Sequence, residues 1–476
     1  MPSPIVRSAR FAAIAAVLTG LLVATGPAAE SAGGFCAADP SVRTFRWAGG
    51  AGTREWVDGA NWNRGVAPGF DGTDVGVRVC LAAGDDVVLV HNDNATHGEA
   101  IVDVLDMQAG SHLAIRPSGR LFLEGDPAGH TSVVRRTPAR AGVLTLSGTL
   151  GGIGTLRVDG RLDWTKTRAG TTMTTRHCQV FAPPCPAGEE PATPGHTRVA
   201  GQGVLTVAGG GVNLVDDRVI TSVGRFVIRA GSYVAADNGT RIEVGAGASS
   251  VMELVDDASI YQGFADDPER ALVRLAGTLV KTGGGTATID ADVQVDPTAS
   301  SSVRGGWLSI GGDRTPGARV RPGASYGVGR CDGANSNCLV PVASIDDPGT
   351  LSVGLPTIAG APTADVLVEE VPLQQVAKDL VPPVDIHVSG ERSTAVKPMR
   401  FRFRLDQTAV ADDPTPESLV ILRKPAGAPA APVVDCRQDG TPPTGRRACV
   451  ASRTTLSDGD VRLVVNSQVN SRWKIR

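Results

Sequence analysis

Pairs of adjacent aspartates, four of them within residues 85–267, come closest to a catalytic pattern in this sequence. A glycosidase needs two carboxylates set across a cleft at a defined separation. Adjacent residues on a strand point to opposite faces, so the two members of one pair could not face each other across a cleft. Because aspartate is common in turns, we expect turns at Asp85-Asp86, Asp216-Asp217, Asp256-Asp257 and Asp266-Asp267. The pattern assigns no catalytic residue.

Metal and phosphate motifs are weak or absent. Gly151-Gly152-Ile153-Gly154 begins like the calcium-binding β-roll repeat, but Leu156 stands where that repeat has its aspartate ligand. The seven histidines are scattered, and the sequence has neither a His-Glu-x-x-His motif nor a phosphate loop. We therefore predict no metal, no cofactor and no catalytic residue. The formal net charge of −3 also gives no basic excess that would favour nucleic acid.

Three tryptophans lie among glycines near the start of the chain: Trp47, Trp56 and Trp62. Exposed tryptophans of a secreted protein can stack on sugar rings, which makes these three residues candidate surface contacts. They could instead plug the open end of a stacked core, because repeat proteins must cap their ends. We favour the cap and keep the surface contact as the alternative.

Eight cysteines fit an oxidising compartment. Their short separations favour sequential pairing, although connectivity cannot be deduced from sequence alone. The alternative is a zinc site near Cys178 with His177 and His196, but the sequence has no Cys-x-x-Cys pair to support it. We therefore predict the disulfides Cys36–Cys80, Cys178–Cys185, Cys331–Cys338 and Cys436–Cys449.

The elements that must position any site are short strands. Residues 142–164 repeat one phrase, glycine-x-apolar, four times at a spacing of six. Apolar residues two apart within each phrase indicate strands, because successive side chains of a strand alternate between faces. Strands this short cannot bury an apolar face alone, so we predict that they stack coil upon coil into a β-solenoid. Leu156 should then point inward among equivalent leucines, with Arg157 and Arg161 pointing outward.

The phrase continues to about residue 311. After residue 351 the sequence pattern changes to longer runs of alternating apolar and polar residues, typical of strands, separated by Pro-rich turns. This pattern favours an antiparallel sandwich. The predicted fold is therefore all-β, a parallel β-helix followed by a C-terminal antiparallel β-sandwich. The predicted divisions are a signal peptide (1–31), a cap with the first coils (32–100), the solenoid (101–311), a stapled loop or linker (312–350) and the sandwich (351–476).

Residues 1–31 have the pattern of a secretory signal peptide. Arg7 and Arg10 precede an apolar run over residues 11–23, and small residues follow it. The run is shorter than the ~20 residues that a bilayer-spanning helix requires. We therefore expect a secreted, extracellular protein without a membrane span.

The N-terminal motif, with Trp47-Ala48-Gly49-Gly50, Trp56, Ala60-Asn61-Trp62, Pro68 and Asp74-Val75, resembles the opening of secreted bacterial β-solenoid proteins. Autotransporter passengers and large exoproteins have this repeat type. Residues 275–289 resemble one of their recurrent coils, and residues 449–473 resemble the small sandwich that closes many bacterial secreted proteins. The resemblance implies a fold and not a particular function. Without a translocator barrel, we expect export by the general secretory route.

Two functions remain open. The first is a non-enzymatic structural or adhesion module whose partner is a polysaccharide or another surface protein. The second is a carbohydrate-active β-helix enzyme, a lyase or hydrolase, which is suggested by analogy with the fold alone. Acids from different coils could converge to form its site. Residues 441–476 hold seven Arg or Lys against two Asp, a local excess of +5. This excess could be a solvated strand face or a contact with an anion or cell wall.

Overall fold

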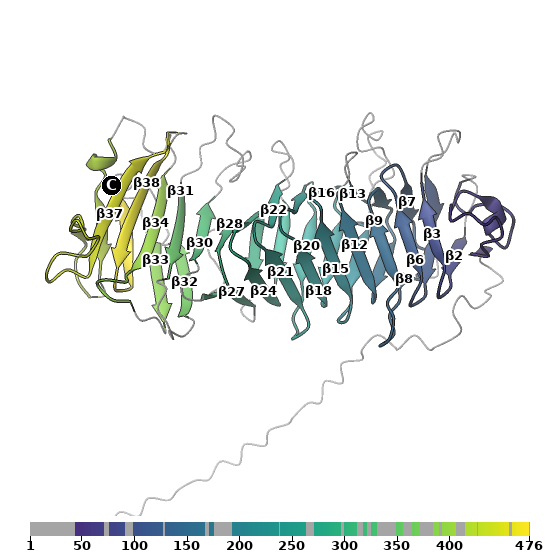
Figure 1. Ribbon diagram of the computed structural model, residues 1–476, viewed down its shortest axis with the longest axis horizontal. Coiled ribbons are helices and arrows are strands. Elements are labelled where there is room, and N and C mark those ends of the chain that lie inside the picture. The colour runs from purple at the N-terminus through teal and green to yellow at the C-terminus, as the bar shows by residue number, and fades with distance from the viewer. Residues whose placement is uncertain are drawn as a thin grey trace, which may run out of the picture.

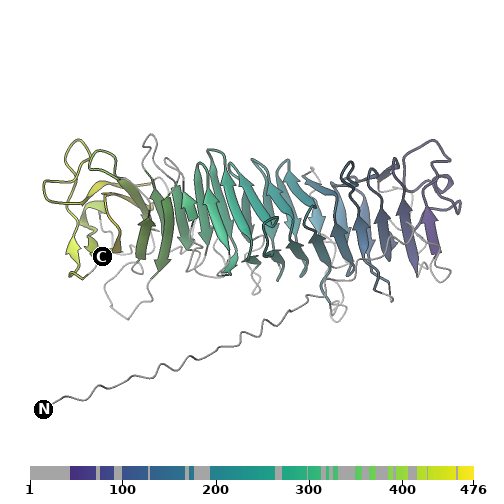
Figure 2. The same ribbon diagram turned by 90° about the horizontal axis from the view of Figure 1, so that it is seen from below.

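In the computed structural model, the protein is an elongated rod of stacked β-strands (Figure 1). The structure describes residues 43–475, except for the following segments: 71–75, 91–98, 127–128, 167–170, 176–192, 238, 263–270, 297–298, 312–317, 321–324, 331–348, 356–363, 371–383, 390–392, 406–414, 426 and 457–458. The N-terminal part lies at one end of the rod and the C-terminal strands lie at the other (Figures 1 and 2). No helix among the described residues is long and apolar enough to cross a membrane.

Along most of the rod, each coil adds one short strand to each of three sheets, and the stacked strands run parallel. The first sheet has ten strands: β1 (Arg43–Arg46), β2 (Val77–Leu81), β5 (Val104–Met107), β8 (Ser132–Val134), β11 (Thr155–Val158), β14 (His196–Val199), β17 (Val219–Ser222), β20 (Arg241–Val244), β23 (Leu272–Leu275) and β26 (Asp292–Val295).

The second sheet has fifteen strands, and its parallel part ends at β29. Its members are β3 (Asp86–Leu89), β6 (His112–Ile115), β9 (Val143–Leu146), β12 (Arg161–Thr165), β15 (Val204–Ala208), β18 (Arg225–Ile228), β21 (Val251–Val255), β24 (Thr278–Thr282), β27 (Ser300–Val303), β29 (Ala318–Val320), β32 (Ala364–Glu370), β33 (Val384–Ser389), β39 (Ser471–Ile475), β35 (Ile421–Lys424) and β36 (Ala431–Pro432).

The third sheet has fourteen strands, and its parallel part ends at β30. Its members are β4 (Ala100–Val102), β7 (Arg120–Leu123), β10 (Thr149–Gly151), β13 (Thr172–Met173), β16 (Gly211–Leu214), β19 (Tyr233–Ala236), β22 (Ser259–Gln262), β25 (Thr286–Asp290), β28 (Trp307–Gly311), β30 (Ser325–Arg330), β31 (Gly349–Gly354), β34 (Met399–Leu405), β38 (Val461–Ser467) and β37 (Ala448–Thr455).

The repeated glycine-x-apolar phrases form β9, β10, β11 and β12, one on each successive side of the rod. Three phrases complete one coil, so Leu144 and Leu162 pair in register although they are 18 residues apart. The predicted solenoid is confirmed. Its core consists of such aligned inward side chains, for example in the second sheet Leu144, Leu162, Leu205, Phe226, Met252 and Leu279.

Leu156 is fully buried, as predicted, and Arg157 and Arg161 are exposed. The prediction that Leu156 stacks on equivalent leucines is wrong. Its partners in register are Ser132 and Thr197. Both polar side chains are buried and both accept hydrogen bonds: Ser132 Oγ from the Leu105 amide at 2.9 Å, and Thr197 Oγ1 from the guanidinium of Arg218 at 3.1 Å. The interior of the first sheet is therefore partly polar.

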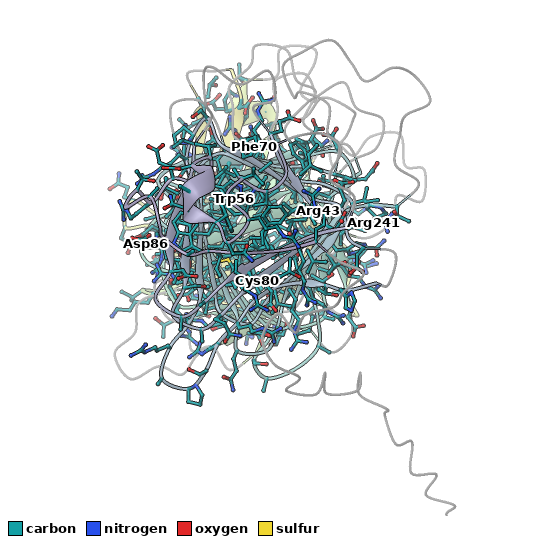
Figure 3. All side chains as sticks on the ribbon, turned by 90° about the vertical axis from the view of Figure 1, so that its right-hand side faces the viewer. Arg43, Trp56, Phe70, Cys80, Asp86 and Arg241 are labelled. Atoms are coloured by element: carbon teal, nitrogen blue, oxygen red, sulfur yellow. A yellow bond between two sulfur atoms is a disulfide. The ribbon has the colours of Figure 1, made fainter. Side chains whose placement is uncertain are left out.

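Residues 43–69 form an incomplete first coil that caps the rod. The segment pairs with all three sheets: β1 with β2, the Trp56 amide with the Val88 carbonyl, and the Ile101 amide with the Gly69 carbonyl. A single-turn 3₁₀ helix, η1 (Gly59–Asn61), lies within this coil. In the end view, Trp56 lies inside the end of the rod, while Asp86 and Arg241 lie toward opposite sides (Figure 3).

Two long cations are buried in the rod and bind backbone carbonyls. The Arg218 guanidinium donates to Gly152 O at 2.7 Å and to His196 O at 3.2 Å. The Lys281 ammonium donates to Thr282 O at 2.7 Å and to Gly283 O at 3.1 Å. Burial lowers the pKa of Arg218 to about 10 and lowers the pKa of Lys281. Arg218 stays charged at neutral pH and links the carbonyls of successive coils.

Antiparallel strands close the rod at its C-terminal end, as predicted. In the second sheet, β29 pairs with β32, and in the third sheet, β30 pairs with β31. The strands β29 and β30 lie in the segment for which we predicted a linker, and they continue the parallel stacks of β27 and β28. The facing sheets pack through Phe401 and Trp473, whose ring centroids are 5.2 Å apart. A 3₁₀ turn, η3 (Pro416–Ser418), precedes β35.

Candidate functional site

The aspartate pairs are mostly turn residues, which supports the interpretation from sequence. Asp216, Asp217 and Asp256 have positive φ angles of 58°, 57° and 52°. The carboxylate of Asp256 accepts from the Gly284 amide at 2.8 Å, and that of Asp257 accepts from the Gly231 amide at 2.6 Å. These carboxylates bind the backbone of neighbouring coils.

The pair Asp85-Asp86 differs, and the fourth pair lies outside the described residues. Asp85 lies in the turn before β3, where it accepts from the Ala82 amide at 2.5 Å, but Asp86 is the first residue of β3. Asp86 binds Arg54 at 2.5 Å and His112 at 2.9 Å. Asp266-Asp267 falls in segment 263–270, so the structure does not describe it.

The remaining motifs also have structural explanations. In Gly151-Gly152-Ile153-Gly154, Gly152 has a φ of 92° and its carbonyl accepts from Arg218, so the glycines turn the chain between two sheets. Residues 323–327 read Gly-Ala-Ser-Tyr-Gly, a match to the nucleophile-elbow pattern. That pattern needs a sharp strand-to-helix turn, whereas Ser325 begins β30, which is paired on both sides. Among the described residues, no group of three or more His, Cys, Asp or Glu could hold a metal.

The proposal that the three tryptophans contact a ligand at the surface is wrong for Trp56 and Trp62. Both are buried, and Trp47 packs against them half-buried. The Trp56 and Trp62 ring centroids are 4.9 Å apart, and those of Trp47 and Trp62 are 5.1 Å apart. Trp56 Nε1 donates to Pro68 O at 3.1 Å, and Trp62 Nε1 donates to Trp56 O at 2.7 Å. The tryptophans plug the open end of the core.

The structure confirms the disulfide Cys436–Cys449. It ties the chain before β37 to that strand, where the Cys436 amide donates to Val450 O at 2.9 Å. The bridge therefore ties a preceding segment to β37 and does not join the two strands of a hairpin. Cys80 is also disulfide-bonded. Five cysteines lie outside the described residues: Cys36, Cys178, Cys185, Cys331 and Cys338.

The outer face of the third sheet has an aromatic pair that we take as the candidate functional site. Tyr233 on β19 and Tyr261 on β22 both point away from the core, because the residues after each of them, Val234 and Gln262, are buried. Their ring centroids are 4.8 Å apart and their planes are tilted by 44°. The Lys166 ammonium lies 5.8 Å from the Tyr233 ring centroid. Adjacent rungs of the third sheet therefore hold two aromatic rings together, and a cation from the residue that follows β12 of the second sheet lies beside them.

Close packing fixes the tyrosine pair. A Cβ atom at Gly211, the register partner of Tyr233 in the preceding coil, would come within 2.1 Å of the Tyr233 ring. The ring therefore lies directly over Gly211, a position at which any side chain would clash with it. Both tyrosines remain partly exposed on the side away from the sheet. The Tyr233 ring is thus held in place before any ligand arrives.

The tyrosine pair suits binding better than proton transfer. Burial raises the pKa of Tyr261, and its hydrogen bond with the Tyr233 hydroxyl raises it further. A phenol with a raised pKa remains protonated at neutral pH, so it is a poor general base. An aromatic face offers an apolar surface beside a polar hydroxyl, which suits a ligand that has both apolar and polar faces. Sugar rings have this property, and a cation near the ring adds a polar contact.

A second cluster of ionisable side chains lies between the third and first sheets. Asp103 follows β4 and Asp126 follows β7, so they occupy the same corner of successive coils. Burial raises the pKa of Asp103, and the charges of Asp126 and Glu124 raise it further. The pKa of Asp126 is lowered. Burial alone would raise it, but hydrogen bonds from the His130 amide, at 2.8 Å, and from the His130 ring outweigh the effect of burial. Opposite shifts in two neighbouring carboxyls are typical of an acid and base pair.

Sequence reasoning missed both groups. Tyr233 and Tyr261 are 28 positions apart in the chain, and nothing local indicates that their coils stack with Tyr261 opposite Ala235. The weak indication was the phrase Gly231-Ser232-Tyr233, which placed one tyrosine on a short strand. Comparisons with protein-family models, curated proteins and solved structures give no match to this chain. Any functional inference therefore rests on the geometry described above.

Proposed function

We propose that this is a secreted, non-enzymatic binding protein that holds an extracellular polysaccharide on the outer face of its third sheet. The proposal of secretion is supported by the leader pattern in residues 1–31 and by the eight cysteines. A stack of coils gives a stiff rod with long flat faces, and such surfaces suit extended polymers. The sequence resemblance to secreted bacterial β-solenoids is consistent with an adhesive or structural role outside the cell.

One observation carries the proposal: the Tyr233–Tyr261 pair with Lys166 beside it on a rigid, outward-facing sheet. Aromatic rings held in advance bind at low entropic cost, because little conformational freedom is lost. The carboxylates of Asp216, Asp256 and Asp257 already bind the protein itself. Retention of a glycan needs only the aromatic pair, whereas cleavage needs carboxylates that are free to act on the substrate.

Retention of the mature protein on a panel of insoluble and soluble polysaccharides tests the proposal. The wild type should bind at least one glycan without releasing shorter products. Tyr261→Ala should weaken that binding by about tenfold, which corresponds to about 1.4 kcal/mol. Val204→Ala, on the outer face of the second sheet, is the control. Failure of the wild type to bind any glycan, or equal loss in both variants, would contradict the proposal.

A carbohydrate-active enzyme is the second candidate function, and the Asp103–Asp126 corner is the observation that favours it. A carboxyl with a raised pKa could act as the acid and its neighbour as the base. If the polysaccharide panel releases reducing ends, Asp103→Asn should abolish that release while retention continues. Cleavage that survives Asp103→Asn would remove this corner as the catalytic site.

A further inference from the structure

Four arginines gather on the outer face of the third sheet near the C-terminal end of the rod. Arg400, Arg402 and Arg404 alternate along β34 with the inward Phe401 and Phe403, and Arg462 lies on β38 directly opposite Arg404. Cross-strand partners in an antiparallel pair have Cβ atoms ~5 Å apart, and like charges at that distance repel. The cluster is therefore a concentration of positive charge that is unfavourable by itself.

The described part of the chain neutralises only one of these charges. Arg404 forms an ion pair with Asp460. Arg400, Arg402 and Arg462 form no ion pair among the described residues. Burial lowers the pKa of Arg402, and the charges of Arg400 and Arg462 lower it further. An unpaired, half-buried guanidinium beside two others is a pre-formed site for an oxyanion, because guanidinium donors match carboxylate, sulfate and phosphate oxygens.

The register of the third sheet links this cluster to the tyrosine pair. Starting from Tyr233, pairing from strand to strand passes through short residues and ends at Arg402: Ser259, Thr288, Ser309, Gly327, Ser352 and then Arg402. These residues share one register position across a single sheet, and in that rank Ser259 and Thr288 are covered, at 8% and 5% exposure. Six strand spacings of ~4.8 Å place Tyr233 and Arg402 ~29 Å apart along the rod. A polymer that joins the two groups therefore passes over the residues that cover Ser259 and Thr288 and does not contact the whole rank.

We propose that Arg400, Arg402 and Arg462 bind the oxyanion groups of an acidic polysaccharide that extends along the third sheet to Tyr233 and Tyr261. This inference rests on the proposed function and defines its ligand class as a glycan with carboxylate or sulfate groups. The tyrosine end contacts sugar rings of either charge, while the arginine end selects for anionic ones. The ligand removes the repulsion among the arginines, which no ion pair of Arg400, Arg402 or Arg462 within the described part of the chain does.

Binding of the mature full chain to three polymers tests the inference: polygalacturonate, dextran sulfate and neutral dextran. Arg402→Gln/Arg462→Gln should raise the Kd for at least one anionic polymer by tenfold or more and should leave binding of the neutral polymer unchanged. Arg241→Gln/Arg274→Gln removes the same charge from the outer face of the first sheet and should change each Kd by less than twofold. Equal loss in the two double variants, or no loss in the first, would overturn the inference.

Two further arms separate this inference from the proposed function. Tyr261→Ala should weaken the binding of both neutral and anionic polymers. Binding that depends on the tyrosines but is unchanged by the arginine substitutions would overturn the inference and leave the proposed function intact. Arginine-dependent binding that ignores the tyrosines contradicts the proposed function and also the continuous track along the sheet. Duplex DNA is the polyanion control, because it has repeated phosphates but does not expose the faces of its sugar rings as a polysaccharide does. Binding of DNA as tightly as the acidic glycans would overturn the assignment of a polysaccharide ligand.

Discussion

Trp56 is the side chain on which the N-terminal cap depends most. It is fully buried, packs on Trp62, and donates a hydrogen bond to the Pro68 carbonyl. Trp56→Ala should lower the free energy of unfolding by about 3–5 kcal/mol, because the large cavity cannot refill. Chemical denaturation measures this value. Val66→Ala, at a half-exposed side chain in the same coil, should stay within about 0.5 kcal/mol, and a Trp56 variant as stable as this control would contradict the cap.

His196 gives the protein a predictable response to acid. Burial lowers the pKa of this imidazole, and the charge of Arg218 lowers it further, below the ordinary 6.5. Between the folded pKa and 6.5, the unfolded chain binds more protons than the folded chain, so stability decreases as the pH falls through that window. His196→Gln should flatten this part of the stability curve, measured by urea unfolding between pH 7 and pH 5. The exposed His387→Gln is the control, and identical slopes in both variants would contradict the assignment.

For single residues, the sequence predicted the role of a side chain better than it predicted which residues that side chain contacts. The tryptophans were recognisable as large apolar residues near an end, and their glycine-rich surroundings favoured a cap. The buried cations were not foreseen, because arginine and lysine are almost never fully buried without a partner. Arg218 is tolerated because carbonyls of the two preceding coils converge on it: Gly152 O from one, and Thr174 O and His196 O from the next. Only the stacking of coils brings these oxygens together, and a single coil read along the sequence does not contain the group.

At the scale of a single strand, Leu156 tests whether the repeated phrase builds the core. Leu156→Asp would place a carboxylate inside the rod between Ser132 and Thr197. An uncompensated buried charge costs about 3–5 kcal/mol, and coupling between neighbouring repeats should spread the damage to adjacent coils. Limited proteolysis should reveal new cleavage within residues 140–215, while fragments that contain β34 and β38 survive. Arg157→Ser, at the exposed next position, should be as resistant as the wild type.

The loop closed by Cys436–Cys449 should stabilise the C-terminal strands selectively. A cross-link between residues 13 apart restricts the unfolded chain by about 3 kcal/mol in the chain-entropy account. Cys436→Ser/Cys449→Ser should therefore increase hydrogen exchange in β37 and β38 far more than in β12 or β15. Hydrogen-exchange mass spectrometry of the full chain measures both regions at once. Equal exchange throughout, with and without the bridge, would show that the bridge contributes no selective stability.

Strand identity was predictable, but strand register was not. The alternation in residues 399–405 predicts the inward Phe401 and Phe403, and β34 has this arrangement. Register between coils depends on how many residues each turn contains, and the connections vary widely, from one residue between β4 and β5 to twenty-two between β13 and β14. A change of one residue in a turn moves a side chain to the other face. This is why neither the Tyr233–Tyr261 pair nor its shared rank with Arg402 could be read from the sequence.

At the scale of the whole molecule, two of the three sheets run from the solenoid into the sandwich without a break. The second sheet changes from parallel to antiparallel pairing between β29 and β32, and the third sheet does so between β30 and β31. The strands β31 and β32 therefore cover backbone groups that would otherwise form open sheet edges at the end of the solenoid. Repeat proteins require such caps, and exposed parallel edges invite pairing with another chain. The sandwich thus has a structural role that does not depend on any ligand.

This role predicts the behaviour of a shortened chain. Deleting residues 349–476 would expose the edges of β29 and β30 that now pair with β32 and β31. The shortened protein should self-associate through these edges, and light scattering coupled to size-exclusion chromatography should detect species larger than one chain. The Cys436→Ser/Cys449→Ser protein keeps both pairings and should remain at the mass of the wild type. If the shortened chain also stays at the mass of a single chain, the solenoid closes its own end, and the sandwich is retained for another reason, such as the arginine cluster on its surface.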